Sequence, residues 1–265
     1  MSRLWWIVLT LSLAVDVSYQ AINVFYGCPV SRQLNMHNQL PSEAALNADL
    51  SSIAAQGPLF YSRRINFTPK TPKPETKPPL VVVLPLNSAV ASDASGLAVM
   101  LSLARWAKDR AFLKPVRFVV REGNIPTAEE NSAESILMIG TLGHFSTEEN
   151  SQTYGSMFPN WFSRRADYVA FLSNEGARGL TNVAVGLFSA ACSLSLACVK
   201  TTRPGLSLFP AFNQELNASV PTVLVTDTAL YRPHATLNVK RLSEIIGGLE
   251  AVIEGIACGD MAPVG

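Results

Sequence analysis

The chain has 265 residues, of which 48% are hydrophobic and 15% are charged. This length is enough for one large domain, and the high hydrophobic content excludes a chain that is disordered throughout. The 21 Lys and Arg residues balance the 20 Asp and Glu residues to a formal net charge of +1. A protein that binds nucleic acid through bulk electrostatics needs a clear excess of positive charge, so no nucleic-acid partner is expected.

The first 28 residues have the pattern of a targeting segment. Arg3 is followed by twelve apolar or nearly apolar residues, 4–15, before Asp16 interrupts the run. A secretory hydrophobic region needs about 7–15 such residues, whereas a bilayer span needs about 20. No clear cleavage site follows, and apolar residues resume up to Cys28. Residues 1–28 are therefore predicted to be a signal peptide or an uncleaved membrane anchor, which makes the protein membrane-associated or exported.

Residues 29–68 are polar and mixed, and they are predicted to form an N-terminal helical and extended arm. Within this arm, Ser42 is placed to cap a helix at residues 43–55. Five prolines, spaced by Lys and Thr, fall within residues 69–79. Proline fixes the backbone and removes a hydrogen-bond donor, so this segment is predicted to be an extended, exposed linker.

From residue 80 onward, apolar runs alternate with helical patterns. Strands are expected at residues 80–84, 115–120, 136–140, 168–172 and 220–226, and helices at residues 97–108, 177–191 and 239–257. Continuous apolar runs are typical of strands that are buried on both faces. The alternation predicts a three-layer α/β/α domain with a mostly parallel central sheet over residues 80–257, followed by a tail at residues 258–265.

The cysteines and the glycosylation triplets leave alternatives open. The chain has four cysteines, Cys28, Cys192, Cys198 and Cys258. They allow three pairings, and none has the CxxC spacing of zinc or redox sites, so their disulfide state stays open. Asn66 and Asn217 stand in Asn-x-Ser/Thr triplets. These are candidate glycosylation sites only if the chain enters a eukaryotic secretory pathway.

Residues 80–256 carry several motifs in a recognisable order. A Val-rich strand and an Asp-Ala-Ser-Gly loop before a helix are followed by Met-Ile-Gly at 138–140 and Asp-Tyr-Val-Ala-Phe-Leu-Ser-Asn at 167–174. The longest motif, at 220–232, is Val-Pro-Thr-Val-Leu-Val-Thr-Asp-Thr-Ala-Leu-Tyr-Arg. This ordered set resembles the M28 family of zinc aminopeptidases, whose last motif reads Tyr-Pro-Ala-Leu-Met-Val-Thr-Asp-Thr-Ala-Phe-Tyr-Arg. The resemblance implies a fold of the zinc-exopeptidase type.

The resemblance also implies two zinc ions, and the family's ligand positions can be read in this chain. Zinc binds imidazole and carboxylate side chains, and a carboxylate base must take a proton from the bridging water. The family's ligand positions fall here on Leu86, Ala91, Asn124 and Leu137. His234 is the one histidine left for the family's late ligand, in a shortened segment. Most of these side chains are unsuited to zinc, so no metal, no cofactor and no catalytic residue is predicted.

Other side chains with zinc-binding groups lie near these positions. Glu122, Glu129 and Glu130 belong to a polar connection, where charged side chains are usually solvated. His144 follows a strand in a Gly/Ser/Thr-rich loop, and Asp93 precedes a helix that it can cap. These ordinary roles are favoured over a rebuilt zinc site.

Loss of the ligands in a retained fold favours a catalytically inactive M28 peptidase-like domain. Such a domain would be a scaffold or accessory subunit of a membrane-associated complex, with other protein subunits as partners. Two alternatives stay open: an active zinc aminopeptidase with relocated ligands, and a metal-free module that binds a peptide or another ligand. In the favoured interpretation, Leu86 and Leu137 are expected to meet each other or a shared neighbour near the C-terminal ends of the strands.

Overall fold

The structure is a computed structural model that describes part of the chain. The described residues are 40–56, 78–86, 94–108, 110, 112–122, 126–153, 164–192, the backbone of 197–201, 216, 219–233 and 235–258. The predicted targeting segment 1–28 lies outside these ranges, as do Asn66, Ala91, Asn124, Asn217 and His234. Among the residues described, no helix combines the length and the apolar character needed to cross a membrane.

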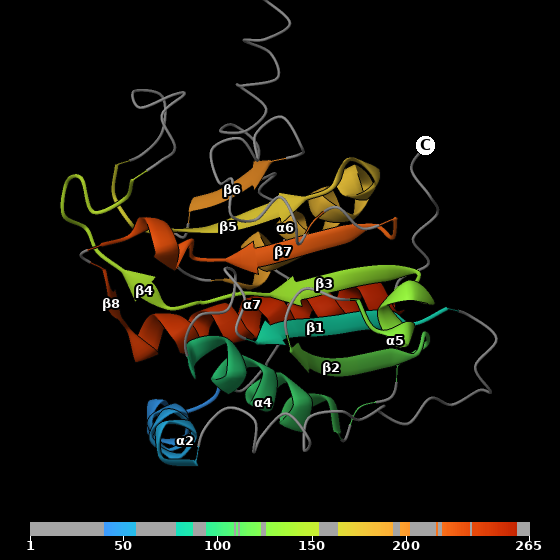
Figure 1. Cartoon of the computed structure of the whole chain (residues 1–265), viewed down its shortest axis with the longest axis horizontal. Coiled ribbons are helices and arrows are strands. Elements are labelled where there is room, and N and C mark those ends of the chain that lie inside the picture. Colours follow the sequence, from blue (N-terminus) through green and yellow to red (C-terminus); the bar gives the residue numbers. More distant parts are fainter. Residues whose placement is uncertain are drawn as a thin grey trace, which may run out of the picture.

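The described part of the chain contains a six-stranded sheet with strand order β2-β1-β3-β7-β5-β6 (Figure 1). The strands are β1 (Leu80–Leu86), β2 (Val116–Glu122), β3 (Ser135–Ile139), β5 (Tyr168–Ser173), β6 (Ala197–Thr201) and β7 (Thr222–Thr226). The four strands β2, β1, β3 and β7 are parallel to one another, whereas β5 runs antiparallel to β7 and parallel to β6. The predicted mixed α/β fold with a mostly parallel sheet is confirmed.

Four long helices lie together against this sheet. They are α2 (Glu43–Gln56), α4 (Ala94–Lys108), α6 (Arg178–Ala191) and α7 (Val239–Cys258). Helix α7 packs between α4 and α6, and α2 packs against α4 and α7 (Figure 1). Short helix α5 (Ala128–Asn131) lies in the connection from β2 to β3. In the strand order, the chain moves one way from β1 to β2 through α4 and then the other way from β2 to β3. Because such crossovers are right-handed, α5 belongs to the opposite face.

Close helix packing depends on one glycine of α7. A Cβ atom added to Gly248 would lie 2.5 Å from the ring of Phe188 on α6. The absence of a side chain at Gly248 therefore lets α6 and α7 approach closely. Phe188 in turn makes an edge-to-face contact with Phe171 of β5, with ring centroids 5.2 Å apart. This contact ties the helix layer to the antiparallel part of the sheet.

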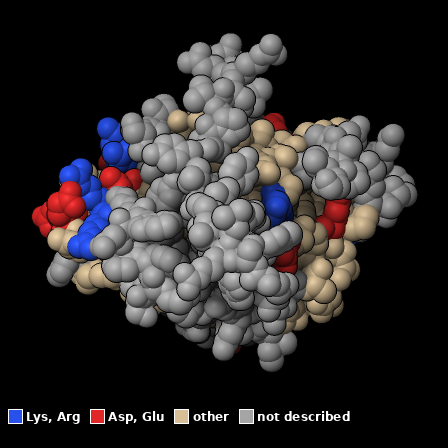
Figure 2. Space-filling model, turned by 90° about the horizontal axis from the view of Figure 1, so that it is seen from above, with Lys and Arg blue, Asp and Glu red and all other residues tan. Residues whose placement is uncertain are grey.

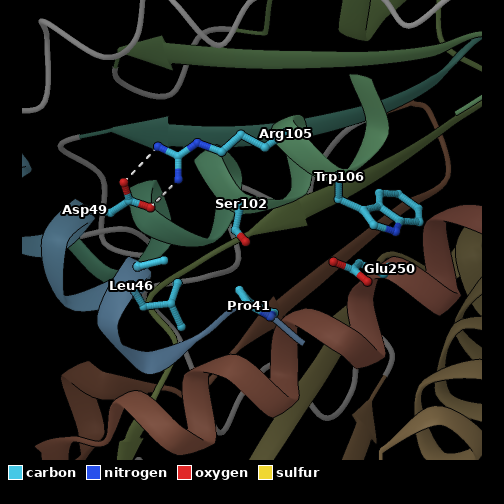
Figure 3. A pocket seen from close by; sticks show the side chains of 8 residues that line it. Pro41, Leu46, Asp49, Ser102, Arg105, Trp106 and Glu250 are labelled. Carbon is cyan, nitrogen blue, oxygen red and sulfur yellow. Dashed lines mark hydrogen bonds and ion pairs between the residues drawn. The ribbon is translucent and has the colours of Figure 1, made fainter. Parts of the chain in front are cut away.

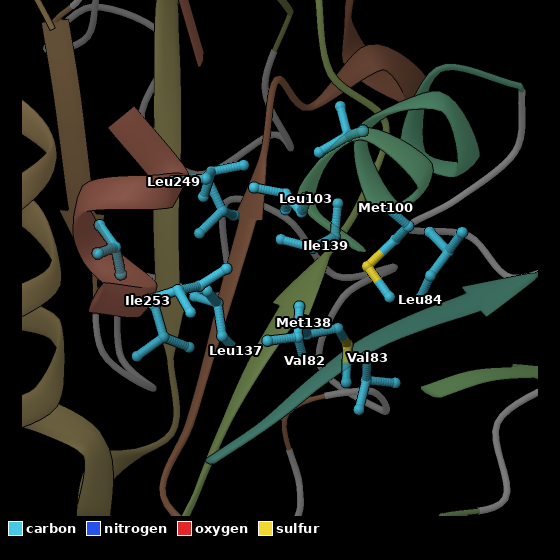
Figure 4. Close-up of a cluster of buried hydrophobic side chains, with 14 of the residues drawn as sticks. Val82, Val83, Leu84, Met100, Leu103, Leu137, Met138, Ile139, Leu249 and Ile253 are labelled. Atoms are coloured by element: carbon cyan, nitrogen blue, oxygen red, sulfur yellow. The ribbon is translucent and has the colours of Figure 1, made fainter. Parts of the chain in front are cut away.

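Part of the core lies between the parallel strands and the helices α4 and α7, and part lies on the opposite face of the sheet, because successive side chains of a strand point to opposite faces. Figure 4 shows side chains of β1, β3, α4 and α7 in this cluster. Those labelled are Val82, Val83, Leu84, Met100, Leu103, Leu137, Met138, Ile139, Leu249 and Ile253. All are almost completely buried, and each large aliphatic side chain contributes about 1.5–3 kcal/mol by leaving water.

The first described helix, α2, is attached to this body. Ser42 accepts a hydrogen bond from the backbone N–H of Ala45 at 3.2 Å, which confirms Ser42 as the cap of the predicted helix. Leu46 and Ile53 of α2 are buried. The hydroxyl of Ser243 on α7 donates to the carbonyl of Pro41 at 2.7 Å. The arm predicted from the sequence is therefore packed on the domain over residues 40–56.

A small two-stranded sheet extends from the ends of the parallel strands. It pairs β4 (His144–Phe145) with β8 (Thr236–Leu237) in antiparallel fashion. Two 3₁₀ turns, Glu175–Ala177 and Ala229–Tyr231, follow β5 and β7. The small sheet is too short to leave a periodic pattern in the sequence, and its strands were not among the predicted elements.

Candidate functional site

The C-terminal edge of the parallel strands is the place where open α/β sheets bind their ligands. In the described part of the chain, this edge is formed by the ends of β1, β3 and β7 and by the segments that follow β3 and β7. Leu86, at the end of β1, is only 3% exposed and belongs to the hydrophobic core. Its neighbour across the sheet is Glu122, at the exposed end of β2.

Leu137 does not lie at this edge. It occupies the middle of β3, in register with Val82 of β1 and Val223 of β7. Val82 precedes Leu86 by four residues, which separates the levels of Leu86 and Leu137 by roughly 13 Å along the strands. The expectation that the two leucines touch each other near the strand ends is therefore wrong, whereas a neighbour shared by both stays a prediction; both leucines are buried. The remaining matched positions, Ala91, Asn124 and His234, lie outside the described residues.

The most polar feature of the edge is the carboxylate of Asp227, which follows β7 and is fully buried. Its Oδ2 atom accepts the backbone N–H of His144 at 2.7 Å and lies 2.9 Å from Nδ1 of the same histidine. Its Oδ1 atom accepts the hydroxyl of Thr141 at 3.1 Å and the backbone N–H of Ala229 at 2.9 Å. Both carboxylate oxygens are therefore occupied by groups of the protein itself.

A second buried polar side chain, Arg232, supports the same region. Its Nη1 atom donates to the carbonyl of His144 at 2.6 Å, and its Nη2 atom donates to the carbonyl of Tyr168 at 2.7 Å. Its Nε atom donates to Gln152 Oε1 at 2.7 Å. The guanidinium also lies 4.7 Å from the ring centroid of Tyr168, in a cation–π contact. Arg232 thus connects β4, the start of β5 and the segment after β7.

The backbone of this region is held in uncommon conformations. Thr228 has a φ of 60°, in the left-handed region that β-branched residues seldom adopt. Its hydroxyl donates to Gln152 Oε1 at 3.2 Å, and its backbone N–H donates to the hydroxyl of Thr226 at 3.0 Å. These contacts hold Thr228 in place. Gly143, with a φ of 95°, makes the turn between Thr141 and His144.

These observations define what the edge can do chemically. An Asp–His pair is the arrangement that enzymes use to orient a general base. In this protein the aspartate also anchors two backbone N–H groups and a threonine, so it is an element of the fold. Within the residues described, no group of three or more His, Cys, Asp or Glu side chains is arranged to hold a metal ion.

The structure corrects two interpretations made from the sequence. Glu130 is buried, with 2% exposure, and contacts Arg121 Nε at 3.2 Å, so it is not solvated. It also forms a capping box with Thr127 at the start of α5. His144 is part of β4 and pairs with Asp227, so it is not an isolated loop residue. The two residues are 83 positions apart, so this pair was not predicted from the sequence. The only local signal near it was the matched motif around Asp227.

Positively and negatively charged side chains are mixed on the part of the surface that Figure 2 shows. There, Lys and Arg atoms lie beside Asp and Glu atoms. The ion pair between Arg165 and Glu149 is one such neighbouring pair among the described residues. This mixture agrees with the balanced composition of the chain.

Comparisons with known proteins find similarity in structure and none in sequence. No family model and no curated protein matches the chain. Among solved structures, the LapA aminopeptidase of Legionella pneumophila has a TM-score of 0.47 and 12% identity, covering 98% of this chain and 75% of its own. The zinc aminopeptidase BSAP from Bacillus subtilis has a TM-score of 0.47 and 16% identity, covering 73% of this chain and 50% of its own.

A third similar structure has another activity. It is the catalytic domain of CwlV, an N-acetylmuramoyl-L-alanine amidase from Bacillus (Paenibacillus) polymyxa var. colistinus, with a TM-score of 0.39 and 13% identity. The match covers 66% of this chain and 96% of that domain. Similarities this distant concern the fold and assign no activity to the chain. Membership of the M28 family and loss of its ligands stay predictions from the sequence.

Proposed function

We propose that the chain is a catalytically inactive M28 peptidase-like domain that serves as a scaffold or accessory subunit of a membrane-associated complex. The observation that supports this most directly is the state of Asp227, the acidic residue at the C-terminal end of β7. Its two oxygens are engaged by four internal contacts, and no solvent reaches it. A catalytic carboxylate needs a face that is open to its substrate or metal. Here the carboxylate stabilises the loops around it.

The strand end at Leu86 agrees with this proposal. An M28 resemblance places a zinc-binding histidine at Leu86, yet this residue is buried in the core. Clustered carboxylates and histidines repel or lose solvation without a metal, so neutral side chains stabilise a domain that does not bind zinc. The connection to a membrane is proposed from residues 1–28 and depends on the targeting pattern of the sequence.

The first test is the purification of the full-length chain from the cells that produce it, under conditions that preserve native complexes. We expect stoichiometric protein partners, no stoichiometric zinc by elemental analysis and no hydrolysis of aminoacyl-anilides. Two zinc ions per chain, with an activity that disappears on chelation, would support the relocated-ligand aminopeptidase and contradict the proposal. A chain without zinc that binds a peptide but no protein subunit would support the binding module.

A second test replaces the leucines at the matched positions. The variant Leu86→His/Leu137→Asp should unfold at lower denaturant concentration than the parent in the absence of zinc, because both positions are buried. An unpaired polar group in such a place costs about 1–3 kcal/mol. A variant that is as stable as the parent without zinc would show that these two positions tolerate polar side chains, and it would contradict the proposal.

A further inference from the structure

A cavity of about 340 Å³ lies in the helix layer, away from the strand ends described above. It opens to the surface and is lined by residues of α2, α4 and α7 and by Pro41 (Figure 3). Its lining residues are Pro41, Ala45, Leu46, Asp49, Ser102, Arg105, Trp106 and Glu250. Cavities that bind small molecules usually have volumes from about 300 Å³, so this one is large enough for a molecule with a ring.

Two polar groups in this cavity lack a hydrogen-bond partner. Among the described residues, neither the Nε1 atom of Trp106 nor the Oε2 atom of Glu250 has one, although both atoms are buried. Glu250 as a whole is only 2% exposed. Figure 3 shows the indole nitrogen of Trp106 turned toward the carboxylate of Glu250. An N–H donor and an oxygen acceptor thus face each other without forming a bond.

Such an arrangement is unfavourable unless a third group fills it. A buried polar atom that is left without a partner costs about 1–3 kcal/mol, and natural proteins seldom keep two together. A hydroxyl group satisfies both atoms, because its oxygen accepts from Trp106 and its hydrogen is donated to Glu250. The cavity wall formed by Pro41 and by Ala45 and Leu46 of α2 is apolar. An apolar body next to the hydroxyl fits this wall.

We propose that this cavity is a binding site for a small neutral molecule that carries a hydroxyl group on an apolar body, with the hydroxyl bridging Trp106 and Glu250. The other charged group at the cavity is already paired, because Arg105 donates two hydrogen bonds to Asp49 at 2.7 and 2.8 Å. This pair joins α2 to α4 at the cavity and leaves the Trp106–Glu250 side for the ligand.

The electrostatics of Glu250 favour a neutral ligand over a cation. The pKa of Glu250 is raised to about 7, mainly by burial; Arg110 opposes the rise and Glu254 adds to it. The guanidinium of Arg110 lies 4.6 Å from the centroid of the Trp106 ring and pairs with Glu254 at 2.9 Å. Arg110 does not line the cavity, so Glu250 is the charged group that a ligand meets on this side. Its raised pKa weakens its attraction for a cation, whereas a hydroxyl can bond to either form of the carboxyl group.

Binding can be measured with four matched probes and the purified full-length chain. The probes are benzyl alcohol, toluene, benzylamine and benzoate, which share a ring and differ in the polar group. We expect benzyl alcohol to bind about tenfold more tightly than toluene, which is the effect of one or two satisfied hydrogen bonds. The amine and the acid should bind more weakly than the alcohol. In NMR spectra, benzyl alcohol should shift the indole N–H resonance that the variant Trp106→Phe removes.

Variants on α7 locate the site. Glu250→Leu should abolish the preference for benzyl alcohol over toluene, whereas Glu250→Gln should keep it, because the amide still offers an acceptor. Glu244→Leu is the matched control, since Glu244 also has a buried Oε2 without a hydrogen bond but lies outside the cavity. Glu244→Leu should leave the preference unchanged.

Four results would overturn the proposal. The first is equal binding of benzyl alcohol and toluene to the parent chain, and the second is tighter binding of benzylamine than of the alcohol. The third is a preference for the alcohol that survives Glu250→Leu. If none of the probes binds, the two polar atoms are satisfied by water alone and the cavity is not a ligand site. Should Glu250→Leu fail to fold, the shift of the Trp106 N–H and the Glu250→Gln variant decide the question in its place.

Discussion

Replacing Asp227 by asparagine tests whether this carboxylate is an element of the fold. The side chain accepts from the hydroxyl of Thr141, the backbone N–H groups of His144 and Ala229, and the imidazole of His144. Asparagine keeps one oxygen and presents an amino group in place of the other. Whichever oxygen is replaced, a backbone N–H then faces this amino group, donor against donor, while the Thr141 hydroxyl or the His144 imidazole must change its role to accept.

The size of the effect follows from these contacts. A hydrogen bond to a charged group contributes about 1.5–3 kcal/mol, and the site is fully buried, so the lost contacts cannot be replaced by solvent. Asp227→Asn should therefore lower the free energy of unfolding by roughly 3–5 kcal/mol. Urea unfolding followed by circular dichroism measures this change directly.

Two controls accompany the measurement. Glu149→Gln breaks a surface ion pair with Arg165 and should change the free energy of unfolding by less than about 0.5 kcal/mol. Thr141→Val removes the hydroxyl donor alone, and its effect should be smaller in the Asp227→Asn background, since the two residues share a hydrogen bond. A change below about 1 kcal/mol for Asp227→Asn would contradict the structural role and reopen Asp227 as a functional carboxylate.

Three further changes test other parts of the structure. Folding raises the pKa of Glu250 from 4.5 to about 7, so stability should fall by about 2 kcal/mol as pH rises through that window, and denaturation of Glu250→Gln should lack this slope; an unchanged slope contradicts the burial. Gly248→Ala places a methyl group against Phe188, which should lower the free energy of unfolding by about 1–3 kcal/mol and with it the midpoint of thermal unfolding. An unchanged midpoint would mean that α6 and α7 can move apart without loss of stability. Asn150 has a φ of 61° at an exposed turn, so Asn150→Gly should leave the free energy of unfolding, measured in urea, nearly unchanged. Asn150→Val should lower it by about 1–2 kcal/mol. Equal stabilities of the two variants would contradict the left-handed conformation at this turn.

The long elements could be predicted because their signals are local. The run at 80–84 is apolar throughout, and the stripe of 239–257 repeats at helical spacing, so both elements appear where expected. Strand direction left no such signal. A strand that is buried on both faces has the same composition in either direction, and the antiparallel pairing of β5 with β7 is set by the rest of the fold.

The polar contacts escaped prediction because their partners are distant in sequence. Glu130 and His144 lie in polar segments that usually face water, and only the folded chain brings Arg121 and Asp227 to them. Glu250 follows Leu249 on α7 at the border of the apolar stripe, where the sequence cannot tell a solvated acid from one covered by α2. The positions matched to the M28 ligands could be found by comparing motifs. Where such a residue lies along its strand, as for Leu137, depends on the pairing register with the neighbouring strands.

The contact between Ser243 and Pro41 joins residues 202 positions apart, so it has a consequence for how the nascent chain emerges from the ribosome. At about 5–20 residues per second, α7 leaves the ribosome roughly 10–40 s after α2. During this interval α2, with its apolar side chains Leu46 and Ile53, has α4 to pack against but lacks the surface that α7 later supplies. The position of α2 on the domain is therefore completed only when the last helix has been synthesised.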